Sequence, residues 1–414
     1  MAEGEDSLPA GAEPEGKSLE RQIRAFHQVR LLAELPDRRA GSAGEREAAR
    51  RVFDWMGDLG FDEMAEQAVP GEPRPGLRLA LPLGLSAAGC ALGGIFGLAL
   101  AGAAAFAFRR EERAEKRALS ALLDAPDSLN VVARAGSRQP RRRVVVSACL
   151  DAPQAGRILP DRLGRALRPA SGAPLLWCER LLSSAVVVAA ASALGASGGL
   201  LAAAQAAVAL ALLVGAAAAL EWAFAPASPG ASDASGVAAL LACAEQLHAQ
   251  LRDDTELWLV AAGSGHAGAR GLAAFLDTHP EWQSERTLFV HFDRVGGGAL
   301  RYLASEGVLA RTEYPPRLRE LARRLAEGGA FAEVSPVDLA GRTAARHVAR
   351  RGCSVLALVA LEEDGAPRGD RDRAGAEGDV AESLDLQTVV RAADFAAAVI
   401  VAAWRGESDP LAIV

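Results

Sequence analysis

The chain has 414 residues, half of them hydrophobic but only 5% aromatic, and its formal net charge is -7. This length accommodates one α/β core of about 250 to 300 residues together with additional segments. The basic residues are mixed with acidic ones and form no stripe interleaved with aromatic residues, so nucleic acid is not an expected partner.

The first folded part is expected to be helical. Residues 1–17 are acidic and rich in Pro and Gly, which predicts a disordered tail without a cleavable export signal. Residues 18–75 then have helical spacing. Ser42 followed by Glu45 predicts a capping box at the start of the second helix, and Gly60 predicts the end of that helix.

Two long uncharged stretches interrupt the chain, thirty residues at 79–108 and forty at 181–220. About 20 apolar residues span a bilayer as one helix, so the second stretch predicts a membrane hairpin within residues 181–224. The first is either one long tilted helix or two short re-entrant helices. We favour the re-entrant pair, because the domain must begin and resume on one side of the membrane. Buried helices of a soluble protein are the less favoured interpretation, since such helices seldom lack a polar face over this length.

Basic residues flank both stretches, whereas the expected turns contain no Lys or Arg. Positive residues concentrate on the cytoplasmic side of membrane proteins. We therefore expect an integral membrane protein whose soluble domain faces the cytoplasm. The five cysteines are odd in number and form no CxxC pair, which agrees with a reducing compartment.

Outside these stretches, strand-like and helix-like runs alternate over residues 127–175 and 226–404, before a tail at 405–414. The strand-like runs include RRVVVSACL, ELWLVAAG, TLFVHFD and CSVLALVAL. This alternation is typical of an α/β fold with a mostly parallel central sheet that helices cover on both faces.

Two segments, PDRRAGSAGEREAARRVFDWMGDLGFD and SPGASDASGVAALLACAEQL, resemble the opening and the metal-bridging turn of metallopeptidase family 28, the co-catalytic zinc aminopeptidases. The likeness covers about residues 18–75, 127–175 and 226–404. It implies a three-layer αβα domain, interrupted here by the two membrane inserts. In this family, two zinc ions activate a bridging water beside a glutamate that serves as general base.

Most metal-site positions differ from the family's motifs. Cys149 stands at a zinc-binding histidine, and Ser232 at the bridging aspartate, with Asp233 one position later. Gly265 occupies the general-base position and His266 the ligand position after it. Because glycine cannot transfer a proton, the resemblance implies a catalytically degenerate site.

Two positions are retained. Asp151 matches the carboxylate that orients the first histidine, and Asp293 matches a ligand. The last histidine ligand aligns with Ala345, with a histidine two residues further on. The possible substitute ligands beside Asp293 are Cys149, Asp233, His266 and His347.

The resemblance and the substitutions lead to one main hypothesis and one alternative. We expect a membrane-anchored, zinc-aminopeptidase-like protein that is degenerate, has no assured cofactor, and binds a peptide or protein partner as a scaffold. The alternative is an active zinc aminopeptidase that holds its metal through thiolate and imidazole. Against it, a buried cysteine and an ordinary surface histidine are the commoner states of these residues. A transporter is disfavoured, because serines and Gln205 are the only polar residues in the spans.

Overall fold

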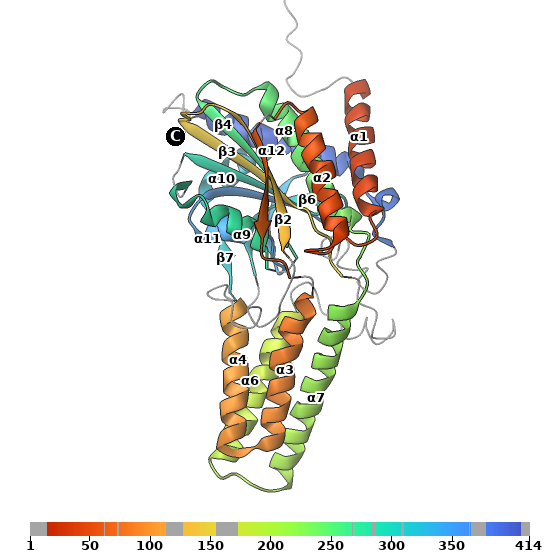
Figure 1. Ribbon diagram of the computed structural model, residues 1–414. Coiled ribbons are helices and arrows are strands. Elements are labelled where there is room, and N and C mark those ends of the chain that lie inside the picture. The colour runs from red at the N-terminus through yellow and green to blue at the C-terminus, as the bar shows by residue number, and fades with distance from the viewer. Residues whose placement is uncertain are drawn as a thin grey trace, which may run out of the picture.

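The computed structural model describes residues 15–61, 63–72, 74–112, 127–154, 173–266, 268–282, 286–307, 310–363, 365 and 378–406. An α/β domain is joined to a bundle of helices that projects from one side of it (Figure 1). Helix α1 begins at Glu15 and α12 ends at Gly406. The rest of the two expected tails lies outside the described residues.

A nine-stranded mixed sheet forms the centre of the domain, in the order β1-β2-β4-β3-β5-β9-β6-β7, with β8 beside β6. Strands β4, β3, β5 and β9 are parallel to their neighbours at the centre, whereas β1, β2 and β7 pair antiparallel. This confirms the predicted α/β fold with parallel strands at the centre of its sheet. The strands are β1 Glu63–Val69, β2 Ser128–Gly136, β3 Arg142–Cys149, β4 Thr255–Ala262, β5 Thr287–Asp293, β6 Ala299–Glu306, β7 Thr312–Glu313, β8 Ser335–Leu339 and β9 Ser354–Leu361.

Helices cover both faces of the sheet. Successive side chains of a strand point to opposite faces, so the fully buried strands contribute to an apolar core on each side. On β5, Val290 and Phe292 belong to the larger apolar core, whereas Phe289 belongs to the smaller core on the other face. The larger core packs under α1 Glu15–Ala33, α2 Ala43–Asp58, α8 Ala231–Ala249, α10 Pro316–Glu327 and α12 Leu386–Gly406. The smaller core packs under α9 Arg270–Asp277, α11 Arg346–Arg350 and the 3-10 turn Pro280–Trp282.

The start of α2 is fixed by the residues that the sequence indicates. The hydroxyl of Ser42 accepts from the backbone N–H of Glu45 at 3.0 Å, which is half of a capping box. The carboxylate of Glu45 accepts from the N–H of Gly41 at 2.5 Å, one residue before the expected position. Glu45 thereby ties the helix start to the loop that precedes it.

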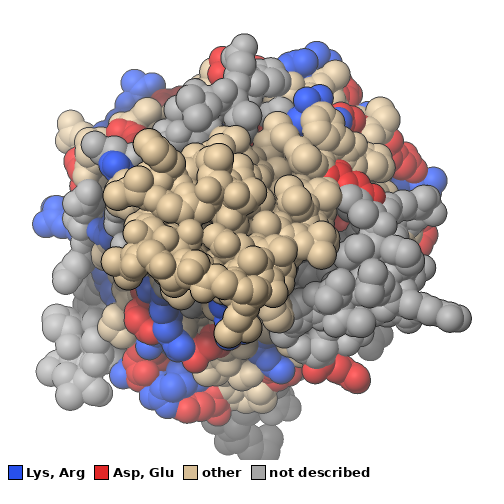
Figure 2. All heavy atoms as spheres, turned by 90° about the horizontal axis from the view of Figure 1, so that it is seen from below, with Lys and Arg blue, Asp and Glu red and all other residues tan. Residues whose placement is uncertain are grey.

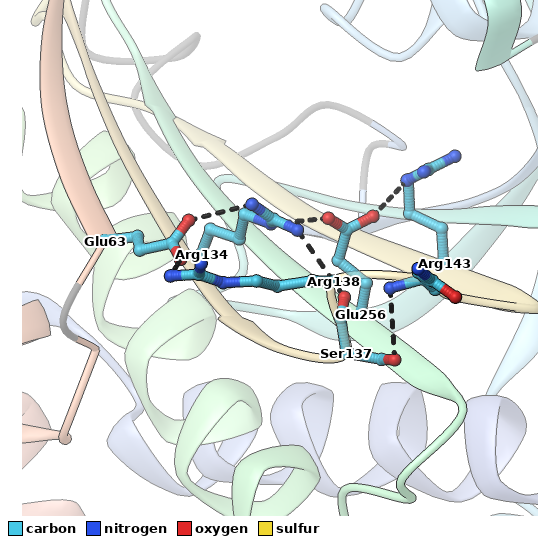
Figure 3. A network of polar contacts seen from close by, with 7 residues as sticks. Glu63, Arg134, Ser137, Arg138, Arg143 and Glu256 are labelled. Atoms are coloured by element: carbon cyan, nitrogen blue, oxygen red, sulfur yellow. Dashed lines mark hydrogen bonds and ion pairs between the residues drawn. The ribbon is translucent and has the colours of Figure 1, made fainter.

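A network of ion pairs crosses four strands at the amino ends of β3 and β4 (Figure 3). The carboxylate of Glu256, which is 3% exposed, lies 2.5 Å from Arg134 Nε and 2.5 Å from Arg143 Nε. Arg134 also contacts Glu63 on β1 at 2.8 Å. Part of the arginine run at 141–143 is thus bound within the sheet.

The bundle consists of two helical hairpins, α3 Pro75–Leu92 with α4 Gly94–Glu112, and α6 Ala173–Ala193 with α7 Gly199–Phe224. The first turns at Gly93, whose φ of 63° favours glycine. Residues 79–108 therefore form two helices rather than one. The two hairpins share an apolar core of their own, which includes Leu83, Phe108 and Leu212.

Three described helices, α6, α7 and α12, are long and apolar enough to cross a membrane. Their surroundings differ, since 56% of the apolar window of α12 is buried, against 17% for α6 and 11% for α7. Helix α12 is therefore part of the domain core. Viewed from below, the bundle shows a continuous surface without Lys, Arg, Asp or Glu (Figure 2).

Candidate functional site

The candidate site lies at the carboxyl ends of β3, β4 and β5, the edge at which open α/β sheets bind ligands. Cys149 and Asp293 are the last residues of β3 and β5, which pair in parallel. His266 follows β4, and Asp233 lies in the first turn of α8. The fold thus brings residues that are far apart in the sequence to one edge.

An ion pair between Asp233 and His266 occupies the middle of this edge, with 3.0 Å between Oδ1 and Nε2. The Asp233 side chain is 1% exposed and that of His266 23%. Burial would lower the pKa of His266, but the charges of Asp233 and Asp151 outweigh it and raise the pKa to about 9. Burial would raise the pKa of Asp233, yet His266 and the nearby arginines hold it below its usual value. Both partners are therefore charged at neutral pH.

Two arginines that sequence reasoning missed supply further positive charge. Arg38 is fully buried, donates from Nη2 to the carbonyl of Gly230 at 2.6 Å, and acts electrostatically on Asp233. Arg294 Nε lies 3.4 Å from Asp293 Oδ1. In the sequence, Arg38 belongs to the Arg pair in PDRRAGS, and Arg294 directly follows the retained Asp293. These two features could have indicated that both arginines lie near the site.

Ser232, which the motif alignment predicts at the position of the family's bridging aspartate, binds another carboxylate. Ser232 donates to Asp379 from both its backbone nitrogen, at 2.8 Å, and its Oγ, at 2.9 Å. Asp379 begins the segment DVAESLD, and its pKa is raised by burial and by the charge of Asp233. This contact joins residues 379–385 to the start of α8.

The retained Asp151 binds the backbone of the loop after β4. It accepts from the N–H of Gly265 at 2.6 Å and from that of His266 at 3.3 Å. A Cβ at Gly265 would lie 2.5 Å from Cys149 Sγ, so the glycine is needed for this close approach. A glutamate at this position is incompatible with the present place of the thiol.

Cys149 is 8% exposed, and burial together with the charge of Asp293 raises the pKa of its thiol well above the ordinary value. Without a metal ion, a thiol with a raised pKa stays protonated, whereas the thiolate is the nucleophilic form. Cys149 therefore packs as a small apolar residue at the end of β3.

His347 binds the loop that follows β4. Its Nε2 donates to the carbonyl of Gly268 at 2.9 Å, and burial lowers its pKa to about 3. Ala345, two residues earlier, is fully buried. Across the described ranges, no three His, Cys, Asp or Glu side chains gather closely enough to hold a metal ion.

Comparison with known proteins agrees with the motifs. Residues 218–400 match peptidase family M28, and no curated protein matches the chain significantly. A zinc aminopeptidase from Bacillus subtilis has a similar structure, with TM-score 0.54 and 14% identity over 92% of this chain and 95% of that one. A glutaminyl cyclase from Bacteroides thetaiotaomicron gives 0.54 and 12%, covering 92% and 97%.

A leucine aminopeptidase precursor from Bacteroides thetaiotaomicron gives TM-score 0.52 and 12% identity, covering 92% of this chain and 96% of that one. Identities this low show a shared fold. The family match covers only the part of the chain from the end of α7 to α12, which includes Asp233, His266 and Asp293. Residues 218–400 are therefore similar to peptidase family M28, and the chain shares the fold of solved zinc aminopeptidases.

Proposed function

We propose that the chain is a membrane-anchored, aminopeptidase-like binding or scaffold protein that does not hydrolyse peptides. One observation carries this proposal: two buried carboxylates at the site edge, Asp233 and Asp293, already lie against the chain's own cations. Asp233 pairs with His266, and Asp293 lies against Arg294. Further cations such as zinc would have to displace these contacts.

The zinc that the fold family implies does not fit the residues present. Cys149 packs in the smaller apolar core, Ser232 and Asp379 bind each other, and His347 binds a backbone carbonyl. Gly265 also offers no group that moves a proton. We therefore assign no step of peptide hydrolysis to this site.

Helix length supports anchoring by α6 and α7, which have 21 and 26 residues. At a rise of 1.5 Å per residue they measure about 32 and 39 Å, enough for a hydrocarbon core of about 30 Å. The hairpin of α3 and α4 is shorter, with 18 and 19 residues, and its turn contacts Ser192 near the end of α6. Two hairpins that enter from one side leave the whole domain on the cytoplasmic face.

The site edge lies beside the base of the bundle. Gln154, three residues after Asp151, donates to the carbonyl of Ala223 at the end of α7, at 3.3 Å. Gln154 also bridges to Ala227, a few residues before Asp233. A peptide or protein that reaches this edge therefore has to approach along the membrane surface.

The test combines anchoring and activity on the full chain. Alkaline carbonate washing should leave the protein in the membrane fraction, and tags at both termini should be protected from protease in sealed cells. The purified protein should release no amino acid from aminoacyl-nitroanilides, with or without added zinc, under conditions in which a zinc aminopeptidase does. Peptidase activity that depends on Asp293 would establish the alternative, and an N-terminal tag outside the cell would refute the topology.

A further inference from the structure

Three arginines at the domain end of the bundle share one arrangement, in which the guanidinium lies over an aromatic ring. The distances from guanidinium carbon to ring centre are 4.7 Å for Arg74 over Phe224, 5.8 Å for Arg110 over Phe106 and 5.8 Å for Arg180 over Trp177. These pairs involve the start of α3, the end of α4, the start of α6 and the end of α7. The three arginines therefore lie at the end of the bundle that joins the domain, and together they are called the basal arginines.

The charge of these three arginines is not neutralised by a carboxylate in the described part of the chain. Two neighbouring arginines differ in this respect: Arg109 lies 2.5 Å from Glu179, and Arg78 lies 3.8 Å from Glu72. Arg74 and Arg180 are exposed. The basal arginines thus keep positive charge available to a ligand.

The rings beneath the guanidinium groups are exposed as well, at 61% for Phe106, 52% for Trp177 and 61% for Phe224. Residues 79–108 and 181–220, which make up most of the bundle helices, contain no Lys, Arg, Asp or Glu, and the end of the bundle seen from below has an uncharged surface (Figure 2). Tryptophan at the end of a membrane helix sits at the boundary between headgroups and hydrocarbon, and Trp177 lies near the start of α6. The three arginines at this end of the bundle therefore lie near the level of the lipid phosphates.

We propose that Arg74, Arg110 and Arg180 bind the phosphates of anionic phospholipid headgroups, so that anionic lipid is enriched around the base of the bundle. The inference rests on the membrane anchoring proposed above. Phosphate oxygens accept hydrogen bonds from cationic side chains, and a negatively charged leaflet attracts each additional basic residue near its surface. The ligand is thus a lipid of stated charge on the cytoplasmic leaflet.

The experiment uses the full chain in bilayers of mixed phosphatidylcholine and phosphatidylglycerol, excised as nanodiscs that retain the neighbouring lipids. Mass spectrometry compares the lipid ratio around the protein with that of the bulk membrane. We expect wild type to be enriched in phosphatidylglycerol, and the triple variant Arg74→Gln, Arg110→Gln and Arg180→Gln to lose that enrichment. The corresponding triple Lys variant should keep most of it, which separates charge from any effect on folding.

A matched control changes three exposed arginines of the domain, Arg50, Arg138 and Arg323, to glutamine. This control should retain the wild-type lipid ratio. A wild-type protein that is embedded but shows no enrichment overturns the inference while anchoring stands. Equal loss in the control, or loss in the Lys variant, also overturns it. A protein released by carbonate washing refutes the anchoring and the lipid site together.

Discussion

Arg38 is the residue whose charge the site can least spare, because it is fully buried and acts on Asp233 and Asp379. Removing one partner of a buried charge cluster costs about 3 to 5 kcal/mol, since the remaining charge stays unpaired. Arg38→Met should therefore lower the free energy of unfolding by that amount in denaturation of the full chain in detergent. Arg39→Met is the control, because its pair with Asp37 is part-exposed and worth about 1 kcal/mol or less. Equal effects of the two variants would contradict the proposed role of Arg38.

A second prediction concerns the close packing of Gly265 against Cys149. Gly265→Ala should destabilise the protein by about 1 to 3 kcal/mol, because its Cβ would meet the sulfur at 2.5 Å. Cys149→Gly in the same chain removes that sulfur and should recover part of the loss. The four stabilities form a double-mutant cycle. Strictly additive effects would show that the thiol does not confine this glycine.

Glu306, on β6, should give the protein a pH-dependent stability. It accepts from the N–H of Thr343 at 2.7 Å, and burial raises its pKa to about 7, against the partly opposing charge of Arg346 and the added effect of Asp293. A raised carboxyl pKa means that the folded state keeps a proton which the unfolded state releases. Stability from this group is therefore present below the unfolded pKa and falls by about 3 kcal/mol as pH rises towards the folded value.

The matched variant is Glu306→Gln, which keeps an acceptor for Thr343 but does not titrate. Its stability relative to wild type should rise as pH increases from about 5 to about 8, measured by denaturation at each pH. A difference that stays constant over this range would rule out the raised pKa.

At the scale of elements, the contact between α3 and α7 depends on Gly76, where a Cβ would lie 2.2 Å from the carbonyl oxygen of Ala219. Gly84, on the same helix, has no atom within 4 Å of its Cβ position. We expect Gly76→Ala to lower the melting temperature and Gly84→Ala to leave it unchanged or raise it, since alanine favours the helix by about 1 kcal/mol. The opposite ranking would place the α3–α7 contact elsewhere.

The elements themselves were largely predictable, because their signals are periodic and local. Buried runs such as TLFVHFD became strands, and the uncharged stretches became helical hairpins. Apolar length alone was a poorer guide, because α12 resembles a membrane span and yet packs on the domain. Only the surrounding tertiary structure distinguishes the two cases.

The site was predictable only in part. Motif alignment identified Cys149, Gly265 and Asp293, and the structure places them at one edge. The motif alignment did not indicate that Arg38 and Arg294 lie at this edge as well, because both come from irregular loops without periodicity. The pairing of Asp233 with His266 also depends on two segments that meet only in the folded chain.

At the scale of the whole molecule, we expect little metal to bind. The chain has the fold of an aminopeptidase, but Asp233 and Asp293 at the site edge lie against His266 and Arg294. Elemental analysis of the purified full chain, after exposure to zinc and dialysis, should find well under one zinc per chain, because no three His, Cys, Asp or Glu side chains among the described residues lie close enough to hold a metal ion. A variant that restores the family's residues should take up more zinc. Its substitutions are Cys149→His, Ser232→Asp, Gly265→Glu, His266→Glu and Ala345→His. Stoichiometric zinc in the unmodified protein, lost together with peptidase activity in Asp293→Ala, would contradict the account.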